Sequence, residues 1–207
     1  SIGGGANSRY IDRGIYLALE PLVERDAFDL SVLYEPLVDA CRYDVFSGVG
    51  GRGTLYGLPM SGNSTVMYYN KDLFDAAGVP YPSPDWDRND WFEMGVQLTR
   101  DVNGNRPTDP AFDQDNVEVT GLGWVTGGQM YADIWMNGGE FVSDDNKRCL
   151  CTEPEVAEIF EWYRDLIYKH RVMCWPGQFM GYDDLFLSQK FAMYGDGTWN
   201  IKYFCDN

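Results

Sequence analysis

Short runs of β-branched and aromatic residues alternate along this chain with capped amphipathic segments, and this alternation limits the folds available to it. TVMYY at 65–69 is typical of a buried strand. Asn70 then predicts the start of a short helix that ends at Gly78. Further strands are predicted at 121–125 and 191–194. Strands that alternate with helices in this way favour an α/β architecture in packed layers.

The helices are predicted from caps and apolar spacing. Residues 153–170 form the clearest one, because Thr152 and Glu155 fit a capping box and an apolar residue recurs every three or four positions. That stripe comprises Val156, Ile159, Phe160, Tyr163, Leu166 and Ile167. Asp85 predicts the cap of a helix over roughly 86–100. Two shorter helices are expected, at about 182–188 and after Trp199.

Charge and length exclude several classes of partner. The 207 residues include 32 acidic and 16 basic side chains, a formal net charge of −16. Such a chain repels phosphate backbones and anionic membrane surfaces, so a nucleic-acid partner is excluded. No apolar run approaches the roughly 18 residues that would cross a bilayer. The five cysteines are odd in number, and one or two disulfides would suit an exported protein.

Catalytic and metal motifs are weak. The single histidine, His170, falls near the predicted end of a helix, where the dipole favours it. The doublets 144–145 and 183–184 leave a glycosidase-type carboxylate pair open. Asp101, Asn103 and Asn105 resemble the start of a calcium loop, but Arg106 stands where that loop needs glycine. An Asn-Gly turn is therefore the preferred interpretation, and no metal or cofactor is predicted.

Three tryptophans are placed where a ligand could stack. Trp124, Trp135 and Trp199 each stand at the end of a predicted strand or beside glycines. Ligands of open α/β sheets collect beyond the carboxyl ends of the strands. An indole there offers a flat face to a sugar ring, while asparagine and aspartate can bind its hydroxyls. Interior packing of the same indoles is the alternative.

The order of these signals resembles a known family. Residues 56–59 read Tyr-Gly-Leu-Pro, and after a strand residues 69–74 read Tyr-Asn-Lys-Asp-Leu-Phe. Later matches are Trp135-Met-Asn-Gly-Gly, Phe191-Ala-Met and Gly197-Thr-Trp. The series resembles the extracellular solute-binding proteins of ABC importers, in the family that contains maltose-binding protein, over nearly the whole chain.

The resemblance implies a two-lobed α/β fold of the type II periplasmic-binding-protein class, with a hinge between the lobes. Members of the family are about twice as long as this chain. By analogy, residues 1–62 are part of the first lobe, 63–65 cross the hinge, and 66–207 are most of the second lobe.

Site residues are implied one by one. Asn63, with Ser64 beside it, falls at a polar ligand contact on the hinge strand. Trp199 matches an aromatic residue that stacks on sugars. Gln129 and Met130 lie near a ligand-facing loop, and two further tryptophans, Trp124 and Trp135, are expected in the wall of the site.

The implied function is non-enzymatic binding of a sugar or oligosaccharide, delivered by hinge closure to the permease of an ABC transporter. The resemblance further implies a monomer outside the cytoplasm, in the periplasm or on the cell surface with a lipid anchor upstream of Ser1. The alternatives are a carbohydrate-active hydrolase with an Asp/Glu pair, or a receptor for a polyol, peptide or polyamine.

Overall fold

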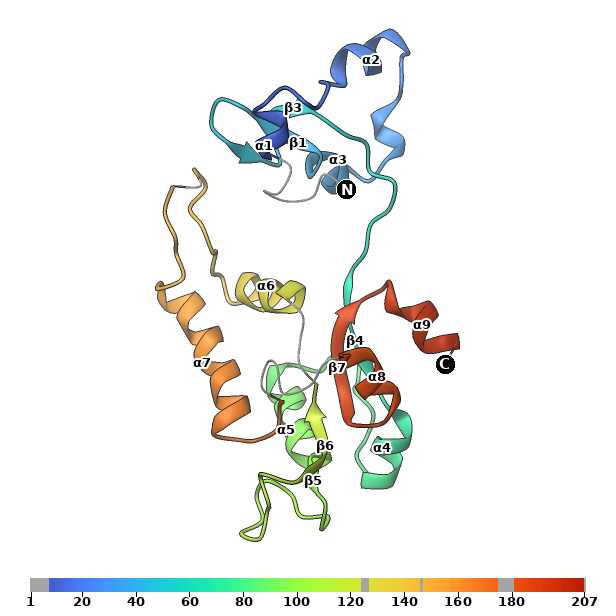
Figure 1. Cartoon of the computed structure of the whole chain (residues 1–207), viewed down its shortest axis with the longest axis vertical. Coiled ribbons are helices and arrows are strands. Elements are labelled where there is room, and N and C mark those ends of the chain that lie inside the picture. The colour runs from blue at the N-terminus through green and yellow to red at the C-terminus, as the bar shows by residue number, and fades with distance from the viewer. Residues whose placement is uncertain (1–7, 124–126, 146, 175–180, 207) are drawn as a thin grey trace. The chain divides into compact units, whose positions relative to one another are not determined.

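The computed structural model describes residues 8–123, 127–145, 147–174 and 181–206 (Figure 1). The chain separates into two compact units. The first comprises Ser1–Gly62 and Glu140–Thr152, and the second comprises Asn63–Gly139 and Glu153–Asn207. The segment 140–152, predicted within the second lobe, thus groups with the first unit. The hinge at 63–65 stays a prediction.

The first unit has a small antiparallel sheet in the order β2-β1-β3. Its strands are β1 (Arg42–Asp44), β2 (Val49–Gly50) and β3 (Thr54–Leu55), and its helices are α1 (Ser8–Ile11), α2 (Glu20–Arg25), the 3₁₀ turn η1 (Leu30–Val32) and α3 (Glu35–Asp39). Pro21 and Pro36 each lie in the first turn of a helix, where a missing N–H costs nothing. Val38, Cys41 and Leu55 form the core.

The second unit is built on a mixed four-stranded sheet in the order β4-β7-β6-β5. The strands are β4 (Thr65–Tyr69), β5 (Arg100–Asp101), β6 (Val117–Leu122) and β7 (Phe191–Gly197). β7 pairs antiparallel with β4 and parallel with β6. Every residue of β7 is buried, as expected for a strand paired on both sides and covered on both faces.

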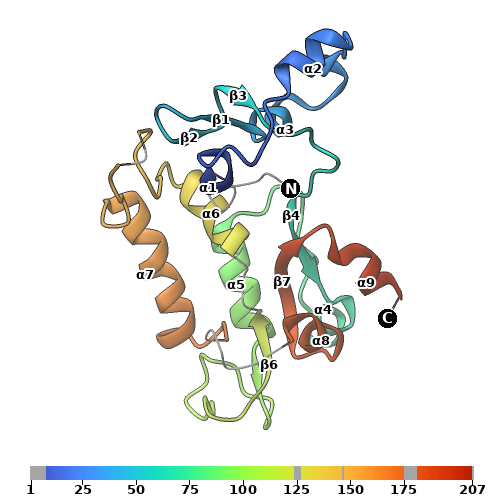
Figure 2. The ribbon, with the colours of Figure 1, turned by 45° about the horizontal axis from the view of Figure 1, so that its top comes forward.

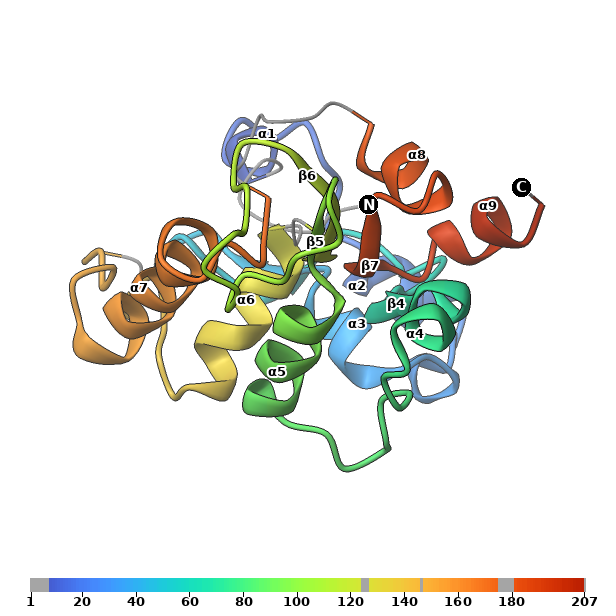
Figure 3. The same cartoon turned by 90° about the horizontal axis from the view of Figure 1, so that it is seen from below.

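Among the described residues, six helices belong to the second unit: α4 (Lys71–Ala77), α5 (Arg88–Leu98), α6 (Gly127–Met136), α7 (Pro154–Tyr168), α8 (Tyr182–Leu187) and α9 (Asn200–Asp206). Figure 3 shows the sheet between α5 and α6 on one side and α8 on the other. The α7 helix packs against α6 and runs beside α5 (Figure 2). The second unit is therefore the layered α/β arrangement that the sequence predicts.

Two glycines let α5 approach the sheet closely. A β-carbon added at Gly121 of β6 would lie 2.2 Å from the carbonyl oxygen of Gly95 on α5. A β-carbon at Gly95 would in turn lie 2.7 Å from Leu122. Only glycine fits at such a close contact between backbones.

Helix starts are partly as predicted. The Asn70 side chain accepts the N–H of Leu73 at 3.1 Å, and Gly78 ends α4 with φ of +66°. The predicted cap at Asp85 is wrong, because Asp87 caps α5 in a capping box with Asp90. The predicted box of Thr152 with Glu155 is also wrong. Helix α7 begins at Pro154, whose fixed φ suits the first helical position, and Thr152 lies outside the cap.

The stripe predicted for α7 is confirmed at five positions, namely Val156, Ile159, Tyr163, Leu166 and Ile167. Phe160 is the exception, because it is more than a third exposed. The helix ends at Tyr168, so His170 lies beyond it, with its ring edge-on to Phe92 at a centroid distance of 4.7 Å.

The loop after Asp101 is held by hydrogen bonds to the carboxylate of Asp101. The carboxylate accepts the N–H groups of Asn103 and Asn105 at 2.8 Å and of Asp113 at 2.9 Å, and the side-chain amide of Asn105 at 3.0 Å. Gly104 follows with φ of +83°, as an Asn-Gly turn requires. Among the described residues, no group of three or more candidate side chains could hold a metal ion.

Two further sequence predictions concern cysteines and membrane spans. All five cysteines fall in the described ranges, and no disulfide joins any of them. The predicted one or two disulfides are therefore not formed in this structure. Within the described ranges, no helix has the length and apolar character needed to cross a membrane.

Candidate functional site

The residues just before β4 and just after β7 lie next to each other, because the start of β4 pairs with the end of β7. Because Thr65 pairs with Gly197, Ser64 comes directly opposite Thr198. The N–H of Thr198 donates to the carbonyl oxygen of Ser64 at 2.9 Å, and the N–H of Ser64 donates to the hydroxyl of Thr198 at 3.3 Å. That hydroxyl also reaches Oδ1 of Asn63 at 3.5 Å. These contacts hold Asn63, Ser64 and Thr198 together. With Trp199, the next residue along the chain, they form a group that we call the strand-end cluster.

Trp199 presents the largest apolar surface of the strand-end cluster. Its ring lies flat on the backbone of Gly197, where an added β-carbon would come within 2.2 Å of it. One side of the indole is thereby fixed, while 58% of the residue stays exposed. A tryptophan that is held on one side and open on the other is a ready stacking surface.

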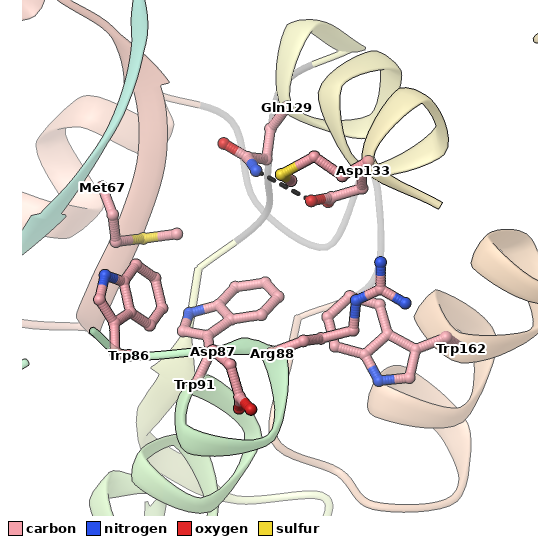
Figure 4. Close-up of a pocket in the computed structure, with 9 residues that line it drawn as sticks. Met67, Trp86, Asp87, Arg88, Trp91, Gln129, Asp133 and Trp162 are labelled. Carbon is pink, nitrogen blue, oxygen red and sulfur yellow. Dashed lines mark hydrogen bonds between the residues drawn. The ribbon is translucent and has the colours of Figure 1, made fainter. Parts of the chain in front are cut away.

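A pocket of about 380 Å³ opens on the same side of the sheet, among α5, α6, α7 and β4 (Figure 4). Its volume is within the range of small-molecule sites. Its walls combine aromatic, sulfur-containing and polar side chains, namely Met67, Trp86, Asp87, Arg88, Trp91, Gln129, Asp133, Met136 and Trp162. We call it the tryptophan pocket.

Three indoles shape the tryptophan pocket. Trp91 and Trp162 pack with centroids 5.3 Å apart at 44°, and the guanidinium of Arg88 lies 5.0 Å above the Trp162 ring. Such a cation–π contact fixes both partners. Trp91 is only 5% exposed, and its Nε1–H is buried with no hydrogen-bond acceptor among the described residues. In Figure 4 this nitrogen points toward Trp86 and Met67.

A buried carboxylate closes the tryptophan pocket from α6. Asp133 is 6% exposed and accepts the side-chain amide of Gln129 at 3.1 Å, one helical turn earlier. The hydroxyl of Tyr163 donates to its other oxygen. Burial, and then the charge of Asp133, raise the pKa of Tyr163 far above its usual value, so this hydroxyl remains a donor.

The predicted site residues therefore fall in two places. Asn63, Ser64 and Trp199 come together in the strand-end cluster, whereas Gln129 lies in the wall of the tryptophan pocket. Met130 is half-buried on α6 and does not line that pocket. Their roles in binding stay predictions.

Trp135 and Trp124 are the two other tryptophans predicted in the wall of the site. Trp135 lies on α6, shortly before the glycines at 138–139, and its ring packs 5.8 Å from that of Tyr131. It is more than half exposed. The predicted wall residue Trp124 lies outside the described residues.

Most of the tryptophan pocket was not predicted. Trp86 and Trp91 fall within the helix predicted over roughly 86–100 and were not singled out as site residues, and Arg88, Asp133 and Trp162 carry no motif. They come from α5 and the residues just before it, from α6 and from α7, which are far apart in the sequence, so no local spacing predicts them. The available signal was composition, since three of the seven tryptophans line this one pocket.

At least one carboxylate of each doublet takes part in local hydrogen bonds. Asp145 accepts the Ser143 hydroxyl at 2.6 Å within a turn. Asp183 accepts the side-chain amide of Asn200 at 2.8 Å, and burial raises the pKa of Asp183. The same amide donates to Asp196 at 2.9 Å, so Asn200 joins two carboxylates at the start of α9.

A family model and the sequences of known proteins agree on the family to which this chain is similar. The family model described as bacterial extracellular solute-binding protein matches residues 2–204. An arabinooligosaccharide-binding protein of Halalkalibacterium halodurans is 28% identical over 139 residues, which is 67% of this chain and 28% of that protein.

Solved structures of similar proteins agree with this family. The ABC substrate-binding protein Lmo0181 of Listeria monocytogenes, in complex with cycloalternan, is 30% identical with a TM-score of 0.73, over 95% of this chain and 46% of that one. UspC of M. tuberculosis is 25% identical with a TM-score of 0.64, over 95% and 48%. The chain thus spans about a quarter to a half of the length of these relatives. It covers part of the two-lobed type II periplasmic-binding-protein fold.

Proposed function

Because the chain belongs to the family of bacterial extracellular solute-binding proteins, we propose that the protein binds a carbohydrate outside the cytoplasm and passes it unchanged to an ABC importer. Relatives named for arabinooligosaccharide and cycloalternan binding support a sugar over other solutes. The proposal includes a monomeric receptor, in the periplasm or lipid-anchored at the cell surface.

The observation that carries this proposal is the exposed indole of Trp199. It is held against Gly197 beside Asn63, Ser64 and Thr198, so a flat apolar face stands next to amide and hydroxyl groups. Sugars have the complementary surface, with C–H groups on the ring faces and hydroxyls at the edge. Binding of this kind needs no nucleophile or general base.

Delivery would follow from the hinged fold of the family. A ligand favours the closed form only by the amount by which it binds that form more tightly than the open one. We propose that the permease recognises this closed form. The ligand is released there without any covalent step.

The proposal is tested by calorimetric titration of the full-length protein with a panel of arabino-, manno- and gluco-oligosaccharides. Trp199→Ala should weaken the best ligand roughly 10- to 100-fold, because one stacked aromatic face is worth about 1.5–3 kcal/mol. Tyr168→Ala is the matched control, since Tyr168 is 59% exposed on α7 and lies outside the strand-end cluster. Absence of sugar binding, or equal affinities of Trp199→Ala and the wild type, would refute the sugar assignment.

The same samples test for turnover. After prolonged incubation, chromatography should recover the oligosaccharide with its chain length unchanged. Sustained product formation that is lost when one carboxylate is replaced would favour the hydrolase alternative instead.

A further inference from the structure

We propose that the tryptophan pocket is a second carbohydrate subsite, which holds one uncharged sugar ring of a ligand that also contacts Trp199. This inference rests on the proposed function and adds to it a second subsite and the kind of sugar it accepts. It depends on three properties of the pocket: its charge, its unused hydrogen-bonding capacity and its position on the sheet.

The charges in the pocket favour a neutral ligand. Asp133 is buried in one wall and would repel an anionic group, whereas the guanidinium of Arg88 lies over Trp162 in another wall and would repel an ammonium group. A polyamine receptor would need carboxylates around an aromatic box without an arginine in its wall. A polyhydroxylated ring meets no such conflict, because it is uncharged and each hydroxyl can both donate and accept.

Two polar groups in the pocket can still form hydrogen bonds with a ligand. The Nε1–H of Trp91 is buried and has no acceptor among the described residues, which costs free energy unless a ligand or water supplies one. Asp133 has about four acceptor positions on its two oxygens, and the bonds from Gln129 and Tyr163 use two. A ligand hydroxyl could donate to Asp133, and another could accept from Trp91 once Trp86 and Met67, toward which its nitrogen points, move aside. The indole faces beside them supply the apolar contact.

The strand register connects this pocket to the strand-end cluster. Met67 lies in the pocket wall and pairs with Gly195, while Thr65, two residues earlier, pairs with Gly197. Residues directly opposite in an antiparallel pair, and residues two apart on a strand, share a face of the sheet. The ring of Trp199 covers Gly197 on the side where its side chain would project, and Thr65 is exposed. The pocket and the Trp199 ring therefore share one face.

The separation sets a minimum ligand size. Thr65 and Met67 are two residues apart on β4, which is roughly 7 Å along the strand. Because this is the spacing of the backbone positions that carry the two surfaces, we expect a ligand that fills the pocket and also stacks on Trp199 to contain more than one ring. The bound sugar is accordingly a disaccharide or longer, and the pocket distinguishes it from a monosaccharide.

The test uses the full-length protein and arabino- and manno-oligosaccharides of one to four units. Trp91→Phe keeps the aromatic packing but removes the N–H, and we expect it to weaken binding of the best oligosaccharide about five- to tenfold, the effect of one hydrogen bond. Trp86→Ala should cost at least tenfold. Tyr168→Phe, which removes one polar atom outside the pocket, should bind like the wild type. Thermal melts establish that each variant is folded.

A second measurement does not depend on affinity. The indole N–H signal of Trp91, assigned in a ¹H–¹⁵N spectrum by its loss in Trp91→Phe, should shift when the oligosaccharide is added. If Trp199→Ala weakens binding while Trp91→Phe and Trp86→Ala bind normally and this signal stays in place, the subsite is refuted and the proposed function stands. If the wild type binds none of the sugars, the proposed function fails, and the subsite with it.

Discussion

Replacement of Asp101 by asparagine should loosen the whole 102–116 loop, because one carboxylate organises it. Asp101 is fully buried, and its Oδ1 accepts two backbone N–H groups, those of Asn103 and Asn105. Its Oδ2 accepts the N–H of Asp113 and the side-chain amide of Asn105. An asparagine can keep one oxygen in place, but its NH₂ group must then face two donors.

The magnitude follows from the bonds that are lost. Two hydrogen bonds to a charged acceptor disappear at about 1.5 kcal/mol or more each, and the two that remain become neutral and weaker. The free energy of unfolding should therefore fall by about 3 kcal/mol. That is a large part of the 5–15 kcal/mol typical of a domain.

Burial alone would raise the pKa of Asp101, but the hydrogen bonds from Asp113, Asn105 and Asn103 outweigh it and lower the pKa to about 2. Because this is below the ordinary value of 3.8, the carboxylate stabilises the fold fully above about pH 5. The contribution is lost as the pH falls toward 2. The stability difference between wild type and Asp101→Asn should therefore shrink over that interval.

Urea denaturation followed by tryptophan fluorescence is a suitable assay, since all seven tryptophans belong to the second unit. The reasoning is refuted if Asp101→Asn lies within about 1 kcal/mol of the wild type at pH 7, or if the difference stays constant down to pH 2. A calcium-dependent rise in the melting temperature would favour the calcium-loop alternative over the Asn-Gly turn.

Three further substitutions probe the second unit, each by urea denaturation. Gly121→Ala should destabilise by about 1–3 kcal/mol or more, because the new methyl group would overlap the backbone of Gly95; a neutral effect would show that α5 can move away. Asp87→Ala removes the capping box of α5 and should cost about 1 kcal/mol, with no loss expected if the cap is not formed in solution. Tyr163→Phe leaves the buried carboxylate of Asp133 without one donor and should cost about 1–3 kcal/mol, and an unchanged stability would contradict that hydrogen bond.

Structural features that depend only on residues close in the sequence could be predicted from it. Asn70 and Gly78 bound α4 because the cap and the left-handed turn depend only on their immediate neighbours. The box at Thr152 failed for an equally local reason, since Pro154 takes the first helical position and moves the start of α7. The helix that contains Trp135 was not predicted, because α6 begins with two glycines, which are poor helix formers. Packing of α6 against α7 and β7 stabilises it.

The candidate site also has a part that could be predicted and a part that could not. Asn63 and Trp199 could be found because each carries a family motif, although they are joined only through the pairing of β4 with β7. Apart from Gln129, the tryptophan pocket has no such signal. Trp91, Asp133 and Trp162 are brought together by the packing of three helices, and each on its own looks like an ordinary core or surface residue.

The central place of β7 also bears on how the second unit forms during synthesis. β7 is made last of the four strands, yet it lies between β4 and β6. Until the ribosome has passed residue 197, these earlier strands lack their common neighbour, and long-range pairing of this kind is slow. The larger unit therefore stays open through most of its translation, and its unpaired strand edges are exposed to aggregation or to chaperones during that time.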